Sequence, residues 1–355
     1  MILHKDKEDF KSLLQVASEY YKIDERIVEK DYWVSYTLSR LVTFDRKDFI
    51  IFRGGTSLTK CYTDLKRFSE DIDLAVNKNK NLSTTQIKKL ITDVEKYICM
   101  DFQEAKNGVK RKSGNYRNVE YEYPSIFEEV TFAEMNPSLK IETVTFLTPN
   151  PYEKKLVKSI VYDYLKEKGF DEYIKQYNLE PFKLNVLSIK RTLMDKIVSL
   201  VRMSYNTDLS ELLTKTRHLY DLHLTYNTVK EFYLNKNELS SIIKLVRKDE
   251  EVSNFKDKYP YKEKWSKAPI WSIMEKSEIK KSYENNFGKE FVYGELPKYS
   301  DVLKSMKYIQ KHLINLSSKI KKVFIDIKNP IKKFYYINTE KKQNKRMGFY
   351  AKFII

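Results

Sequence analysis

The sequence predicts an α/β fold in which a small mixed sheet is followed by a mainly helical part. Three observations support this prediction. Short apolar or alternating runs lie between residues 49 and 147, glycine and proline residues separate them, and helical spacing of apolar residues dominates after Pro151. A chain of 355 residues is long enough for one large domain or two ordinary ones.

The first elements are two helices and a strand. Residues 7–21 and 25–42 carry apolar side chains at helical spacing. The apolar run 49–52 then predicts a buried strand, which the glycine pair after Arg53 ends in a tight turn. Thr56 is expected to cap a helix that reaches about Tyr62, since a hydroxyl at this position accepts a backbone N–H.

The next elements complete the predicted sheet. Residues 71–76 alternate between polar and apolar and indicate a strand. Ser83 begins a Ser-Thr-Thr-Gln capping box before an amphipathic helix. Residues 116–123 and 138–147 are typical of strands, and the stretch 110–115 between elements is expected to be an exposed basic loop.

Beyond Pro151 the pattern is mainly helical, with one short strand at 182–187 that is expected to rejoin the sheet or pack on it. Helices are predicted at 152–168, 188–204, 211–225, 229–234, 237–248 and 300–316. The predicted organisation is N-terminal helices packed on the core (1–48), the sheet-bearing core (49–150), a helical C-terminal domain (151–318) and a basic tail (319–355).

The charge of the chain is strongly positive, at +17. Residues 319–355 hold eleven basic and two acidic residues, so this tail carries +9 and the rest of the chain +8. A basic surface favours phosphate-rich partners because neutralised phosphates release counterions. The alternative on composition alone is lysine used for solubility.

Composition also bears on compartment and metal chemistry. No apolar run is long enough for a transmembrane helix and no apolar signal core opens the sequence, so a cytoplasmic protein with no membrane partner is expected. Two cysteines and four histidines without zinc-ligand spacing argue against a zinc site. Any metal is therefore expected on oxygen ligands, which favours Mg²⁺ or a similar hard ion.

A candidate phosphate site lies at the first turn. Gly54 and Gly55 follow a strand, and the hydroxyl residues Thr56 and Ser57 begin a helix. Such a turn presents backbone N–H groups and the positive end of a helix dipole to an anion. Gly-Gly-Thr also occurs in ordinary turns, so this motif is weak by itself.

Two acids form the stronger signal. Residues two apart in a strand share a face, so Asp71 and Asp73 point to one side while Ile72 and Leu74 point to the other. Paired carboxylates repel each other unless a cation lies between them. Metal-dependent phosphoryl transfer uses such a pair. The alternative is a solvated edge strand with incidental acids.

The sequence Arg67-Phe68-Ser69-Glu70-Asp71-Ile72-Asp73-Leu74 after Gly55-Thr56 resembles the signature of the AbiEii/AbiGii-type toxin nucleotidyltransferases, a branch of the polymerase-β-like superfamily. Three further segments resemble motifs of that family in the same order, and the resemblance spans roughly residues 8–316. These segments are Val28–Trp33, Val186–Lys196 and Arg217–Leu222. The spacer from Thr56 to Asp71 is longer than in compact members of the superfamily, and residues 319–355 match nothing in it.

The resemblance implies a polymerase-β-like core and assigns roles to individual residues. Asp71, Asp73, Lys196 and Asp221 would be catalytic, and Asp71 and Asp73 would hold Mg²⁺ or Mn²⁺. Nucleotide or phosphate contacts would come from Gly54, Gly55, Thr56, Ser57, Arg67, Ser69 and Arg217.

Several of these residues have a plainer interpretation. Glu142 is either a third metal ligand or a solvated strand residue. Lys196 lies on an apolar stripe, where it either extends to solvent or neutralises triphosphate oxygens. Arg217 and Asp221 could form only a surface salt bridge between successive helical turns. Lys190 and Arg191 either contact substrate or form a solvated face, and His218 is expected to pack.

The function implied by the resemblance is that of a nucleotidyltransferase toxin of a bacterial toxin–antitoxin or abortive-infection system, active in phage defence. It would transfer a nucleotide from a nucleoside triphosphate to RNA, such as a tRNA 3′ end, and release pyrophosphate. The cognate antitoxin would be a separate transcriptional regulator. One alternative is a small-molecule or protein hydroxyl as acceptor. Another is a non-catalytic nucleic-acid- or partner-binding protein, against which the paired acids argue.

Overall fold

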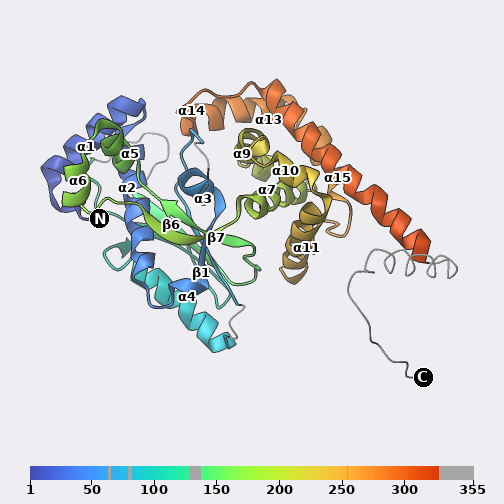
Figure 1. Cartoon of the computed structure of the whole chain (residues 1–355), viewed down its shortest axis with the longest axis horizontal. Coiled ribbons are helices and arrows are strands. Elements are labelled where there is room, and N and C mark those ends of the chain that lie inside the picture. Colours follow the sequence, from blue (N-terminus) through green and yellow to red (C-terminus); the bar gives the residue numbers. More distant parts are fainter. Residues whose placement is uncertain (63–64, 79–81, 128–136, 254, 328–355) are drawn as a thin grey trace, which may run out of the picture.

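The computed structural model describes residues 1–62, 65–78, 82–127, 137–253 and 255–327, and the last part of the predicted basic tail, 328–355, lies outside them. Within these residues the chain forms a mixed sheet with helices on both faces, followed by a bundle of helices (Figure 1). We call residues 1–187 the sheet unit and residues 188–327 the helical unit.

The strands form one mixed sheet in the order β3-β5-β6-β2-β1-β8-β7, with β4 paired to β5 outside this path. The β1–β2 and β5–β6 pairs are antiparallel, whereas β2–β6 and β1–β8 are parallel. The strands are β1 (Ile50–Arg53), β2 (Ile72–Val76), β3 (Gln103–Glu104), β4 (Lys110–Lys112), β5 (Tyr116–Glu122), β6 (Ser138–Val144), β7 (Tyr152–Val157) and β8 (Phe182–Leu187). The predicted return of 182–187 to the sheet is confirmed.

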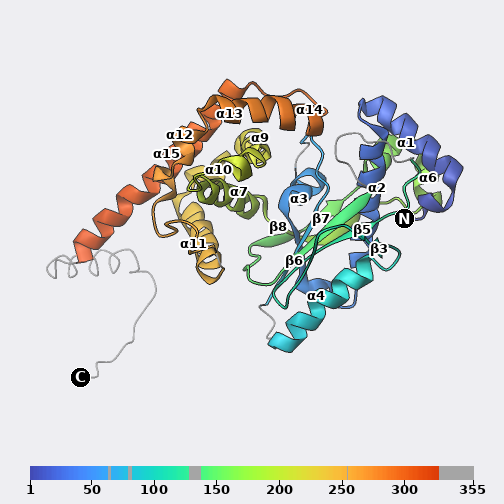
Figure 2. The ribbon, with the colours of Figure 1, turned by 180° about the vertical axis from the view of Figure 1, so that it is seen from behind.

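Helices α2 and α4 pack on β6 from one face of the sheet, and α3 packs on β1, β2, β7 and β8. Figure 2 shows α4 and α2 beside the sheet, with α3 between the sheet and the helical unit. The helices of the sheet unit are α1 (Lys7–Tyr21), α2 (Glu25–Ser39), α3 (Gly54–Cys61), α4 (Thr84–Ile98), α5 (Ile160–Lys168) and α6 (Asp171–Gln176). The predicted capping box of Ser83 and Gln86 on α4 is present.

The helical unit packs around α7 and α9, and the long α15 lies across α9, α10 and α12. Its helices are α7 (Ile189–Met203), α8 (Ser210–Leu213), α9 (Thr216–Tyr226), α10 (Lys230–Leu234), α11 (Lys236–Val252), α12 (Ile270–Ile273), α13 (Ser277–Lys281), α14 (Gly288–Phe291) and α15 (Tyr299–Ile327). Shorter turns are η1 (Leu3–Lys5), η2 (Arg40–Val42), η3 (Lys47–Phe49), η4 (Trp265–Lys267) and the π-helical η5 (Ser282–Phe287).

Each unit has its own hydrophobic core. One cluster of buried side chains runs from Leu3 to Val186, and the second joins residues 193–313. Leu58 and Leu65 of the sheet unit belong to the second cluster, so the segment around α3 is packed into the helical unit. The predicted start of the helical domain was residue 151. Strands β7 and β8 come after that residue, so the predicted boundary lies within the part of the chain that forms the sheet.

Four local predictions were wrong. The helix after the glycine turn starts at Gly54, not after Thr56, because Gly54 takes a φ of +82° and turns the chain directly into α3. Residues 110–112 are a strand because β5 supplies their backbone partners. Residues 152–157 are also a strand: Glu and Lys favour helix, but charged residues suit the open edge that β7 forms beside β8. The last predicted helix extends beyond residue 316 to Ile327.

Candidate active site

The two acids at β2 face the side of the sheet on which α3 lies. Ile72, Leu74 and Val76 are fully buried on the opposite side, whereas Asp73 is half-buried. The alternation predicted for this strand is therefore confirmed. Asp73 pairs in register with Arg53, the last residue of β1, so the chain leaves β1 and enters the glycine turn directly beside Asp73.

The glycine turn is in contact with that acid. A Cβ atom on Gly54 would lie 1.9 Å from Asp73 Oδ2, a distance that no side chain tolerates. A Cβ atom on Gly55 would lie 3.0 Å from Ser69 Oγ and 3.2 Å from a terminal nitrogen of Arg67. Glycine at both positions lets the backbone N–H groups at the start of α3 approach the carboxylates closely.

The hydroxyl groups of the turn are used inside the protein. Thr56 and Ser57 are both fully buried. Thr56 Oγ1 donates to the carbonyl of Asp71 over 2.6 Å and lies 3.0 Å from Ser69 Oγ. Ser57 Oγ donates to the carbonyl of Gly54 over 2.9 Å. These hydroxyls fix the turn to Asp71, so an anion at the turn would be left the backbone N–H groups as donors.

Glu142 lies next to Asp73 on the neighbouring parallel strand, where the two residues are direct register partners. Its carboxylate accepts a hydrogen bond from the Tyr116 hydroxyl over 3.1 Å and lies 3.8 Å from the Arg53 guanidinium. The sheet thus brings a third acid beside the pair. Tyr116 and Arg53 hold the carboxylate of this acid.

The electrostatics at the acids favour a bound cation. Burial and then the charge of Glu142 raise the pKa of Asp73 to about 6. Burial and the charge of Asp73 also raise the pKa of Asp71, while Lys140 and Arg217 act in the opposite direction. A divalent cation would relieve this repulsion, and carboxylate oxygens suit Mg²⁺. Asp71 and Asp73 fit that ion as two ligands, although no group of three or more His, Cys, Asp or Glu side chains in the described residues is gathered around a metal position.

The helical unit presents basic side chains to the acids. The charge of Arg217 on α9 acts on both Asp71 and Asp73. Lys215, at the N-terminal end of α9, lies close enough to interact with Asp71, Asp73 and Glu142, and burial lowers its pKa. Cations on α9 therefore face anions on the sheet across the boundary between the two units.

A buried ion network joins the units behind this face. Asp221 on α9 is fully buried, and Arg67 binds it through two nitrogens, at 2.6 and 2.9 Å. Lys196 Nζ on α7 lies 2.8 Å from Asp221 Oδ2 and 3.4 Å from His218 Nδ1. Burial raises the pKa of Asp221, but Arg67 and Lys196 together bring it below its ordinary value.

This network decides between several interpretations. Lys196 does not extend to solvent, since its side chain is only 7% exposed. Asp221 is paired with Arg67 and Lys196, and the described residues include no ion pair between Arg217 and Asp221. Arg67 is committed to Asp221 and to the Phe68 carbonyl, behind the glycine turn.

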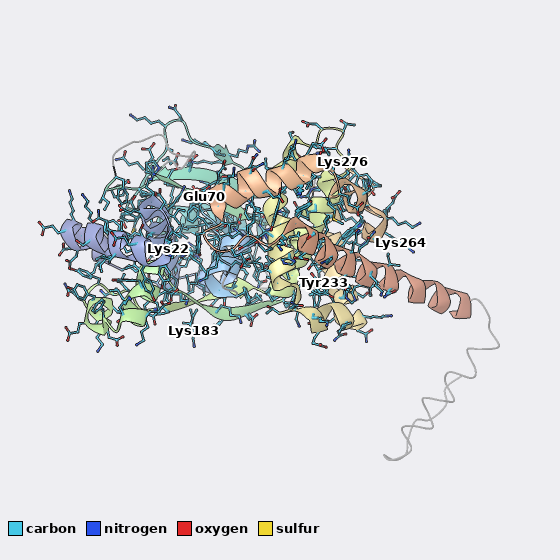
Figure 3. All side chains as sticks on the ribbon, turned by 90° about the horizontal axis from the view of Figure 1, so that it is seen from above. Lys22, Glu70, Lys183, Tyr233, Lys264 and Lys276 are labelled. Atoms are coloured by element: carbon cyan, nitrogen blue, oxygen red, sulfur yellow. The ribbon has the colours of Figure 1, made fainter. Side chains whose placement is uncertain are left out.

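The loop that carries Arg67 is also held by backbone bonds from the helical unit. The N–H of Phe68 donates to the carbonyl of Phe291 over 2.7 Å, and the N–H of Tyr293 donates to Lys66 over 3.0 Å. Arg67 forms an antiparallel bridge with Val292. Glu70, which is labelled in Figure 3, lies one residue before Asp71, and its carboxylate accepts a hydrogen bond from Lys30 of α2.

The structure adds residues that sequence reasoning missed. Lys140 Nζ lies 3.9 Å from Asp71 Oδ1 and stands two residues before Glu142 on β6, so strand alternation could have found it. Lys215, Arg53 and Tyr116 carried no such signal. Arg191, for which a solvated face was one alternative, is 1% exposed and pairs with Asp195 and Asp249 away from the acids.

None of the described helices is both long and apolar enough to cross a membrane. Cys61 and Cys99 are free thiols.

Comparisons with known proteins match the chain to one family. A family model described as "Nucleotidyl transferase AbiEii toxin, Type IV TA system" matches residues 36–304. No curated protein matches the chain. Among solved structures, the nucleotidyltransferase toxin MenT4 of Mycobacterium tuberculosis is 14% identical with a TM-score of 0.49, over 83% of this chain and 89% of that one. A candidate nucleotidyltransferase from H. pylori is 16% identical with a TM-score of 0.37, over 83% and 99%.

Proposed function

We propose a function for this chain, which belongs to the AbiEii nucleotidyltransferase toxin family of type IV toxin–antitoxin systems. The proposed reaction is the metal-dependent transfer of a nucleotide from a nucleoside triphosphate to the end of an RNA, and tRNA is the first candidate for that RNA. Family membership implies nucleotidyl transfer and a cognate antitoxin. The metal, the acceptor, an antitoxin that acts as a separate transcriptional regulator, and a part in abortive infection and phage defence belong to the proposal.

One observation carries the proposal: the antiparallel β1–β2 pair places the glycine turn against Asp73, with Asp71 on the same side. An anion-binding turn and paired acids in direct contact suit a triphosphate whose charge is neutralised by a divalent cation between them. A protein that only bound nucleic acid would gain nothing from two neighbouring acids that face the glycine turn.

The residues take the following parts in the proposed mechanism. The N–H groups at the start of α3 hold the terminal phosphates, and Arg217 and Lys215 approach them from α9. Asp71 and Asp73 would hold Mg²⁺ or Mn²⁺, which when bound neutralises charge at the reacting phosphate. The acceptor hydroxyl attacks the α-phosphorus in line with the bond to pyrophosphate, which breaks as the new phosphodiester bond forms.

Lys196 and Asp221 have different roles in this proposal. Asp221 is a positioning residue: it holds Arg67 beneath Gly55 and orients Lys196. Burial lowers the pKa of Lys196, while Asp221 acts to keep its ammonium charged. A cation preorganised in this way stabilises charge that develops on leaving pyrophosphate.

RNA is the preferred acceptor because the charge of the chain suits a polyanion. The chain carries +17, and +8 remains when residues 319–355 are set aside. The test is incubation of the protein with labelled nucleoside triphosphates, Mg²⁺, and either total RNA or total protein. We expect the label to appear on RNA, and only when Mg²⁺ is present. Label only on protein or on a small molecule would overturn the RNA acceptor.

Lys196→Met tests the part of Lys196 in this reaction. The variant keeps the apolar stem, leaves Asp221 paired with Arg67, and removes one preorganised cation. We expect kcat to fall by roughly 10²-fold or more. Lys190→Met is the matched control on the same helix, because Lys190 pairs with Glu238 away from the acids. Equal turnover in both variants would make Lys196 purely structural.

Gly54→Ala tests the contact between the turn and Asp73. A Cβ atom at Gly54 would displace the Asp73 carboxylate and also strain a φ of +82°. Gly169→Ala is the control, since Gly169 has a φ of +76° but an added Cβ would meet nothing within 4 Å. Both variants should lose about 1 kcal/mol of stability from backbone strain, and Gly54→Ala should lose more because its Cβ also meets Asp73. Only Gly54→Ala should lose transfer, by roughly 10²-fold. Similar transfer activity in the two variants would show that contact between the glycine turn and Asp73 is not needed for the reaction.

A further inference from the structure

The sheet continues beyond the acids as a row of side chains in register. Pairing connects Asp73 with Glu142, Glu142 with Asn118, and Asn118 with Arg111. Cross-strand partners project from the same face of a sheet. The row therefore runs from β2 through β6 and β5 to β4, and three strand spacings of about 4.8 Å place its far end about 14 Å from Asp73.

Two side chains of this row have polar groups that could bind a ligand. Arg111 is exposed, and its guanidinium has no ion-pair partner within the described parts of the chain. Asn118 donates through Nδ2 to the Tyr116 hydroxyl over 3.1 Å, whereas its buried Oδ1 has no hydrogen-bond partner among the described residues. A cation and an unused amide acceptor in one line suit a chain of phosphates and bases.

The neighbours of Arg111 on β4 serve a different face. Lys110 and Lys112 both form ion pairs with Glu104 of β3, as alternation along a strand requires. Arg111 is the register partner of Asn118, whose amide contacts the Tyr116 hydroxyl, so Arg111 lies on the Tyr116 side of the sheet. The three basic residues of β4 are thus divided between two faces, and only Arg111 belongs to the face of the acids.

The direction of the reaction determines which substrate this row contacts. In the proposed mechanism the pyrophosphate leaves toward the glycine turn and α9. In-line displacement requires the attacking hydroxyl to approach from the opposite side of the α-phosphorus. From Asp73 the β1 side leads to the turn, and the other side leads through Glu142 to Arg111. The incoming acceptor must therefore lie over β6, β5 and β4.

We propose that the row Glu142, Asn118 and Arg111 is the track on which the acceptor RNA end lies, with Arg111 on a phosphate and Asn118 on a base edge. A span of about 14 Å corresponds to about four stacked nucleotides at 3.4 Å per nucleotide. The proposal rests on the proposed function for its acceptor class, and it assigns to β4 and β5 contacts with the RNA end.

The test compares Arg111→Gln with Lys110→Gln, which removes the same charge from the adjacent residue on the other face. Binding of a labelled ten-nucleotide single-stranded RNA is titrated at several salt concentrations without nucleotide. Arg111→Gln should weaken binding about 5-fold or more and make the slope of log K against log[salt] shallower by about 0.7, the value for one phosphate contact. Lys110→Gln should change neither by a comparable amount. Equal effects of the two variants would overturn the track.

A second measurement separates this inference from the proposed function. Binding of nucleoside triphosphate should be unchanged in Arg111→Gln, and in transfer assays its KM for RNA should rise while kcat at saturating RNA is kept. Asn118→Ala should likewise raise the KM for RNA and leave nucleotide binding unchanged. If the wild-type protein labels protein but not RNA, the acceptor class fails. The binding data still decide the track in that case: it is overturned if Arg111→Gln binds the RNA oligonucleotide as tightly as the wild type does. Loss of triphosphate binding in Arg111→Gln would overturn the track and assign the row to the nucleotide.

Discussion

Asp73→Asn is expected to abolish nucleotide transfer while the protein remains folded. The change removes the charge that a divalent cation would contact and keeps the shape of a side chain packed against Gly54. Loss of one preorganised charge at a reacting centre costs on the order of 10³-fold in rate. We expect at least that loss for Asp73→Asn and for Asp71→Asn, measured by incorporation of labelled nucleotide under single-turnover conditions.

Stability should separate this loss from unfolding. The pKa of Asp73 is raised to about 6 by burial and by Glu142, so its charge opposes folding near neutral pH in the absence of metal. The thermal midpoint of metal-free Asp73→Asn should therefore equal or exceed that of the wild type. Glu153→Gln, on the exposed edge strand β7, is the control and should keep full activity. Wild-type turnover in either active-site variant would end the metal-dependent mechanism.

Asp221→Ala is expected to produce the largest loss of stability. The substitution leaves the guanidinium of Arg67 and the ammonium of Lys196 buried without their shared carboxylate. Removal of one partner from a buried ion network costs about 3–5 kcal/mol, because the remaining charges lose their compensation. In a unit of 150–250 residues each kcal/mol lowers the melting temperature by roughly 2–4 °C. Thermal unfolding followed by circular dichroism measures the effect.

The control for this change is Glu251→Ala, an exposed carboxylate on α11. Its melting temperature should stay within about 2 °C of the wild type, as usual for a surface change of a few tenths of a kcal/mol. The melting temperature of Asp221→Asn should lie between those of Asp221→Ala and Glu251→Ala, because asparagine keeps an acceptor for Arg67. This variant should also lose activity at temperatures at which it is folded, since a neutral amide with one oxygen acceptor holds Arg67 and Lys196 less firmly than the carboxylate does. A folded Asp221→Asn with wild-type kcat would remove the positioning role.

Much of the local structure could be predicted. The boundaries of α1 and the capping box of α4 follow from local rules, because caps and helical periodicity depend on residues within one or two turns. The strand at 152–157 could not, since its lysine and glutamate residues favour helix and only the partner strand β8 provides the opposing preference. The same reason explains β4, which β5 holds in the sheet.

The sequence by itself determined the family, the paired acids and the glycine turn, because each is a short motif whose spacing sets its own geometry. Tertiary structure alone decided what the other charged residues contact. Arg67 and Asp221 are 154 residues apart in the chain, and Arg111 reaches the row of the acids only through the register of three strand pairs. A buried charge must find a partner, but many carboxylates could serve, and packing of the helical unit on the sheet unit selects one of them.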